Sequence, residues 1–145
     1  MINKDDIPMN AVSPSESQRK FFARLMQETS DYARSKNYSD MHWKGHDDLP
    51  YFGAYSSELN RRGSGLFIFG IDRRGEILRF AFPIDIIEPY RLAKSWTGDP
   101  SRNRAIIEIQ DDLDEEMQLY FIELGKRSID FHYGMKAGPQ HMDKE

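Results

Sequence analysis

Two short apolar runs separated by a tight turn constrain the fold of this chain more than any other feature. Residues 65–71 (GLFIFGI) form a continuous apolar run that is too short for a typical helix and rich in residues that favour strands. The turn Asp72-Arg73-Arg74-Gly75 follows, with a glycine where a left-handed backbone conformation is needed. Residues 76–82 (EILRFAF) then return as a partner strand. The sequence therefore predicts a buried antiparallel hairpin.

A helix over residues 14–36 is predicted ahead of the hairpin by its start signal and its apolar spacing. Ser13 can cap the helix, Pro14 suits the first turn, and Glu16 can reach back to the Ser13 N–H as a capping box. Apolar and small residues then recur three and four positions apart and form one core-facing stripe: Phe22, Leu25, Met26, Thr29, Tyr32 and Ala33.

The remaining elements are predicted from shorter patterns. Residues 37–49 show no periodicity and are expected to form an aromatic loop. Further elements are expected as follows: a helix from Pro50 that ends at the glycines of residues 63–65, a helix over residues 84–94, a loop over residues 96–101, and strands over residues 105–110, 117–124 and 128–133.

This order of elements predicts an α+β fold, in which an antiparallel sheet of about five strands has two or three helices packed on one face. The length of 145 residues is typical of one domain. We expect a flexible N-terminal tail over residues 1–12, a single α+β domain over residues 13–133, and a flexible C-terminal tail over residues 134–145.

Composition excludes several classes of protein. The chain has no cysteine, which rules out disulfide scaffolds, zinc ribbons and thiol catalysis. It has no apolar run long enough for a membrane helix, and its first ten residues lack the apolar stretch of a secretory signal. We therefore expect a cytoplasmic protein with no membrane association.

Charge is distributed unevenly along the chain. Residues 61–104 carry nine basic residues against five acidic ones, whereas residues 105–145 carry four against ten. Nearly all the basic residues in the middle segment are arginine, whose planar guanidinium binds carboxylate or phosphate through two hydrogen bonds. The plainer interpretation is that these arginines form a solvated surface paired with the acidic third of the chain.

The leading functional hypothesis is a small non-enzymatic binding protein of the inhibitor, immunity or accessory type. Its partner would be a protein that handles nucleic acid or another acidic or phosphate-bearing molecule, because arginine, tyrosine and tryptophan are the residues that most often anchor interfaces. A protein is the expected partner, nucleic acid or a nucleotide is the alternative, and a homo-oligomer is compatible with the sequence. No cofactor is expected. The candidate binding residues are Trp43, Tyr51, Arg61, Arg62, Arg73, Arg74, Trp96, Arg102 and Arg104.

Two alternatives stay open. The succession of helix, hairpin and acidic strand resembles in outline the metal-dependent nucleases of the PD-(D/E)xK type, and the resemblance implies Asp72 and Glu108 as metal ligands. The chain departs from that pattern at Gln110, where the family usually has a lysine. The other alternative is a small-molecule site on a polar sheet face, with these contributors: Arg79, Glu108, Gln110, Gln118, Tyr120, Asp130 and His132.

One pair of histidines has ligand chemistry. His42 and His46 lie four residues apart beside Asp47 and Asp48, and these side chains are ligands that zinc, manganese or iron accept. The spacing converges on a helix, but Gly45 favours a loop here. A loop leaves the geometry of the two rings undetermined, and the glutamate of the His-Glu-x-x-His motif is absent, so no metal is expected.

Overall fold

The protein is described here from a computed structural model, which covers residues 15–45, 50–57, 66–83, 86–87, 96–99, 104–110 and 112–136. For residues 96–99, 104 and 135–136 only the backbone is described. The elements are, in chain order, α1 (Glu16–Ser35), β1 (Met41–Gly45), β2 (Tyr51–Ser56), β3 (Phe67–Ile71), β4 (Leu78–Pro83), β5 (Trp96–Asp99), β6 (Arg104–Ile109) and α2 (Glu115–Lys136).

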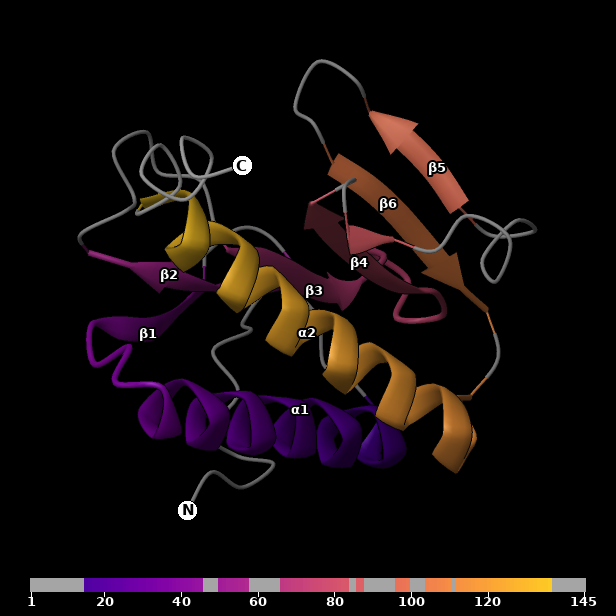
Figure 1. Ribbon diagram of the computed structural model, residues 1–145. Coiled ribbons are helices and arrows are strands. Elements are labelled where there is room, and N and C mark those ends of the chain that lie inside the picture. Colours follow the sequence, from indigo (N-terminus) through magenta and orange to yellow (C-terminus); the bar gives the residue numbers. More distant parts are fainter. Residues whose placement is uncertain are drawn as a thin grey trace.

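The strands form one antiparallel sheet in the order β1-β2-β3-β4-β6-β5, and both helices lie on the same side of it (Figure 1). The predicted α+β class with an antiparallel sheet is therefore confirmed, with six strands where about five were expected. The predicted hairpin is also confirmed, because β3 and β4 pair from Ile68↔Ala81 to Ile71↔Leu78.

The core lies between the sheet and the helices. Alternate residues on the strands point to the helices, which is the two-residue period of β structure. Phe22 of α1 packs against Phe52 and Phe69, and Phe121 of α2 stacks on Phe80 with 4.2 Å between ring centroids. The apolar sheet residues that are fully or almost fully buried on this face are Phe52, Ala54, Phe67, Phe69, Ile71, Leu78, Phe80, Phe82, Ala105 and Ile107.

Helix α1 occupies the predicted range, but its capping differs in detail. Ser15 is the N-cap: its Oγ accepts the Gln18 N–H, while the Gln18 side chain accepts the Ser15 N–H. The predicted cap at Ser13 and Pro14 lies outside the described residues. The capping box therefore begins two residues later than the sequence pattern indicated.

The largest error in the predicted elements concerns residues 117–124 and 128–133, which are not strands but parts of α2. Asp114 begins this helix, since its Oδ1 accepts the Met117 N–H at 2.8 Å. The buried residues then follow the three- and four-residue spacing of a helix, at Phe121, Leu124, Ser128 and Ile129.

Three shorter segments were also assigned wrongly. The predicted loop over residues 37–49 contains β1, the predicted helix from Pro50 is β2, and the predicted loop over residues 96–101 contains β5. Pairing with a neighbouring strand explains all three, because β1 pairs with β2, β2 pairs with β3, and β5 pairs with β6. Of the predicted helix over residues 84–94, only residues 86–87 are described.

Most residues of the two predicted tails, including all of residues 1–12, lie outside the described residues. Residues 134–136 of the predicted C-terminal tail belong to α2.

Gly125 lies in the interior of α2 at the place where the sequence pattern indicated a turn. A Cβ atom at Gly125 would lie 3.0 Å from Thr29 Cγ2 on α1 and 3.2 Å from Phe67 Cζ on β3. The missing side chain thus lets α2 approach α1 and the sheet at the same point, whereas a Cβ at Gly134 would meet nothing within 4 Å.

These two glycines give a matched test of the packing. Gly125→Ala is expected to lower the free energy of unfolding by about 1–2 kcal/mol, because overpacking of a core outweighs the gain in helix propensity. Gly134→Ala near the exposed end of α2 should leave stability unchanged or raise it by about 0.5 kcal/mol. Urea unfolding of both variants measures the difference, and a Gly125→Ala protein as stable as Gly134→Ala would contradict the close approach of α2.

Candidate functional site

The sheet register gathers polar residues at one end of the face that points away from the helices. Tyr51 on β2 pairs with Gly70 on β3, and Gly70 pairs with Arg79 on β4. Arg79 in turn pairs with Glu108 on β6. Since Phe52, Phe69, Phe80 and Ile107 point to the helices, the alternation along each strand directs this row to the opposite face.

The turn between β3 and β4 lies next to this row and is held by its own aspartate. Asp72 Oδ1 accepts the N–H groups of Glu76 at 2.7 Å and Ile77 at 2.9 Å, and the Asp72 carbonyl accepts the Gly75 N–H at 2.9 Å. Gly75 has a positive φ of 75°, as the sequence pattern predicted. Gln18 of α1 donates from Nε2 to the Gly75 carbonyl at 3.3 Å and attaches the turn to the helix.

The electrostatics of this turn keep Asp72 ionised. The N–H of Ile77 holds the pKa of the Asp72 carboxyl below its ordinary value, and the N–H of Glu76 and the charges of Arg74 and Arg79 act in the same direction. The buried Asp72 carboxylate thus stabilises the turn.

Arginines surround this aspartate on the exposed side. Arg73 is exposed and makes no ion pair within the part of the chain that the structure describes. Arg74 is 77% exposed, with Nε 3.3 Å from Glu76 and 3.7 Å from Asp72. Arg79 is 51% exposed and forms a 2.7 Å ion pair with Glu108. We call Tyr51, Arg73, Arg74 and Arg79 the arginine patch.

Trp43 does not lie where the sequence pattern indicated. We expected an exposed anchor flanked by His42 and Lys44, but the ring is half-buried on the helix-facing side of β1 and packs against Phe67 and Phe69 with centroids 5.7 and 5.8 Å away. Its Nε1–H donates to Ser30 Oγ on α1 at 2.9 Å. The Trp43 side chain therefore contributes to the core.

For five other candidate binding residues, the side chains are not among the described parts of the structure. Trp96 lies in β5 and Arg104 begins β6, with backbone alone described for both. Three further candidates lie outside the described residues, namely Arg61, Arg62 and Arg102.

The candidate metal ligands are occupied by other contacts. Asp72 holds the turn and Glu108 pairs with Arg79. His42 is exposed with Nδ1 3.1 Å from the Asp40 carbonyl, and His46 lies outside the described residues. Across the described ranges, no three histidine, aspartate or glutamate side chains lie together as a metal site would require.

The predicted polar sheet face is only partly correct. Arg79 and Glu108 share that face, but four of its expected members lie on α2 instead, namely Gln118, Tyr120, Asp130 and His132. Gln110 follows the end of β6 and is exposed.

A small recess lies between the starts of α1 and α2 and strand β4. Its free volume of about 30 Å³ is room for a water molecule or two, well below the roughly 300–1,000 Å³ of ligand pockets. This recess does not fit a small-molecule ligand. Its lining residues are Ser17, Gln18, Phe21, Leu78, Asp112, Leu113 and Gln118.

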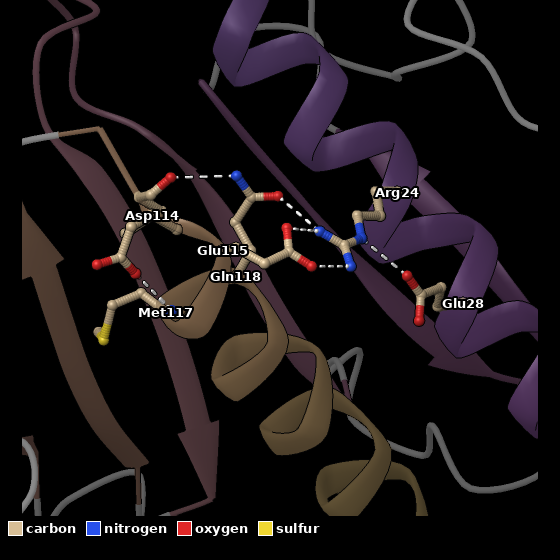
Figure 2. A network of polar contacts seen from close by, with 7 residues as sticks. Arg24, Glu28, Asp114, Glu115, Met117 and Gln118 are labelled. Atoms are coloured by element: carbon tan, nitrogen blue, oxygen red, sulfur yellow. Dashed lines mark hydrogen bonds and ion pairs between the residues drawn. The ribbon is translucent and has the colours of Figure 1, made fainter.

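Two polar networks connect the helices. In the first, shown in Figure 2, Arg24 of α1 donates to both carboxylate oxygens of Glu115 at 2.8 Å and to Gln118 at 3.1 Å on α2. Its Nε also donates to Glu28 at 2.9 Å. A bidentate guanidinium contact of this kind fixes the spacing of the two helices near the start of α2.

The second network, which we call the tyrosine–aspartate cluster, was not anticipated from the sequence. Asp130 on α2 accepts hydrogen bonds from Tyr32 and from Tyr38, the latter at 3.1 Å. Asp40, just before β1, accepts hydrogen bonds from Ser56 and Tyr133. The rings of Tyr38 and Tyr133 stack with centroids 4.0 Å apart. The cluster consists of Tyr32, Tyr38, Asp40, Ser56, Asp130 and Tyr133.

Comparisons with known proteins add no assignment. No protein-family model, curated protein or solved structure matches the chain. In the described helices, no stretch is both long and apolar enough to cross a membrane.

The tyrosine–aspartate cluster predicts a loss of stability at alkaline pH. Burial, followed by the hydrogen bond to Asp40, raises the pKa of Tyr133 from 10.0 to about 12. Because the folded chain has the higher pKa, the stabilisation is complete below pH 10 and is lost as the pH rises through about 12. The unfolding free energies of the wild type and Tyr133→Phe should therefore converge across this window.

Urea unfolding at a series of pH values measures the convergence. Tyr51→Phe, which removes a tyrosine from the other face of the sheet, is the matched control. A difference between wild type and Tyr133→Phe that stays constant from about pH 8 to about pH 12 would show that the hydroxyl does not couple to stability.

Proposed function

We propose that this chain is a binding protein that engages an acidic protein partner through the arginine patch. The observation that carries the proposal is the turn between β3 and β4, where Arg73 and Arg74 are both exposed and Arg73 makes no ion pair within the described residues. A preorganised side chain loses less conformational entropy on binding than one on a mobile loop. The turn is held from inside by Asp72 and from α1 by Gln18.

The composition of the patch supports an interface. Arginine and tyrosine are enriched among the residues that dominate binding energy at protein interfaces. Tyr51 and Arg79 lie on either side of Gly70, which has no side chain to separate them. The patch thus combines an aromatic ring with guanidinium groups on the sheet face and the adjoining turn.

The pattern of charge favours a protein over nucleic acid as the partner. Arg74 pairs with Glu76 and Arg79 pairs with Glu108, so the patch contains carboxylates as well as guanidinium groups. A run of phosphates offers no hydrogen-bond donor to these carboxylates and would be repelled by them. A protein surface can place carboxylates opposite the arginines and donors opposite the glutamates.

Binding of a defined acidic probe tests this proposal. Polyglutamate and oligothymidylate of equal charge are titrated against the wild type and an Arg73→Ala, Arg74→Ala double variant. Two exposed ion pairs contribute about 1 kcal/mol together, so polyglutamate should bind the double variant about fivefold more weakly. Both substitutions are at exposed turn positions and should change stability by less than about 0.5 kcal/mol each.

Arg34→Ala is the matched control. Arg34 is an exposed, ion-paired arginine 16 residues beyond Gln18 along α1, hence about 24 Å from the point where the helix contacts the turn. Arg34→Ala removes one charge where the double variant removes two, so a loss of binding free energy half as large or larger would show that binding follows net charge and would refute the patch. Tighter binding of oligothymidylate than of polyglutamate would identify nucleic acid as the partner class.

A further inference from the structure

An acidic surface lies beside the arginine patch at the same end of the molecule. The chain that enters α2 is exposed and acidic, with Asp112 and Asp114 before the helix and Glu116 in its first turn. The first turn of α1 contacts both surfaces: Gln18 bonds to Gly75 of the β3–β4 turn, and Ser17 donates to Asp112 at 3.4 Å. Figure 1 shows the starts of α1 and α2 and the β3–β4 turn at one end of the fold.

No ion pair joins Arg73 or Arg74 to Asp112 or Asp114 in the part of the chain that is described. Arg74 contacts Asp72 and Glu76 of its own turn, and Arg73 has no ionic partner there. Asp114 uses Oδ1 to cap α2. These two arginines and two aspartates are all exposed.

We propose that the arginine patch binds a second copy of this chain, at the acidic start of its α2, about a two-fold axis. In a two-fold interface each contact occurs twice, because residue i of one protomer meets residue j of the other and the reverse. When a basic surface lies beside an acidic one, the two-fold rotation places the basic surface of each protomer against the acidic surface of the other. This inference rests on the proposed function and names its partner.

The expected dimer is weak and sensitive to salt. Each exposed ion pair contributes little free energy to binding. Salt screens such charges over a Debye length of about 8 Å at physiological ionic strength. The proposed interface buries no part of the apolar core, because that core is already covered by the helices of the same protomer. Self-association should therefore rise at low ionic strength and disappear at high ionic strength.

Charge reversal on each surface tests the pairing by sedimentation equilibrium at low and high salt. The wild type should dimerise at low salt. One double variant carries Arg73→Glu with Arg74→Glu, and the other carries Asp112→Lys with Glu116→Lys. Each should self-associate at least about tenfold more weakly than the wild type. An equimolar mixture of the two variants should dimerise again, because a heterodimer places opposite charges together at both contacts. Arg34→Glu is the control for net charge and should dimerise as the wild type does.

Each outcome decides the proposal. A wild type that stays monomeric at low salt overturns it, and so does a mixture that fails to associate. If the wild type is monomeric while polyglutamate binding still depends on Arg73 and Arg74, the proposed function holds and the partner is a different acidic protein. If a lysine variant unfolds, as judged by circular dichroism, Asp112→Asn, Glu116→Gln replaces it, and unchanged dimerisation of that variant also overturns the proposal.

Discussion

Burial of phenylalanine rings between the sheet and the two helices is the interaction on which the rest of this structure depends. The fully buried rings come from α1, β2, β3, β4 and α2, and each burial contributes on the order of 2–3 kcal/mol relative to an exposed ring. They form one continuous layer in which the Phe52, Phe69 and Phe80 rings of neighbouring strands lie beside one another. Since this layer takes up one face of the sheet, the polar row of Tyr51, Arg79 and Glu108 is directed to the other.

The two polar networks act at opposite ends of the helix layer. Arg24 joins the first half of α1 to the start of α2, whereas Tyr32 joins the last turns of α1 to Asp130 in the second half of α2. Apolar packing between helices is not directional, so it does not by itself fix how far one helix slides along the other. Hydrogen bonds at both ends do fix that position, and Gly125 allows the close approach between them.

The sequence predicted the hairpin and α1 because each is specified by residues close together in the chain. The turn Asp72 to Gly75 and the stripe from Phe22 to Ala33 need no distant partner to be recognised. α2 was misassigned because Met117, Leu119 and Phe121 alternate as a strand would, and Gly125 suggested a turn. The helix forms because Asp114 caps it and because its buried residues meet α1 and β4, a tertiary effect that overrides local preference.

The tyrosine–aspartate cluster was beyond prediction, since Tyr32 and Asp130 lie 98 residues apart. For the arginine patch, the exposure of Arg73 and Arg74 followed from the turn, but the position of Arg79 beside them depended on the register of β4.

Gln18 belongs to two structures at once, and this shared role has a consequence for the dynamics of the molecule. Its Oε1 completes the capping box of α1 while its Nε2 holds the carbonyl of Gly75. Fraying of the first helical turn therefore removes a support from the β3–β4 turn as well. We therefore expect amide exchange in the first turn of α1 to be coupled to exchange in the arginine-bearing turn, although the two segments lie more than 50 residues apart in the chain.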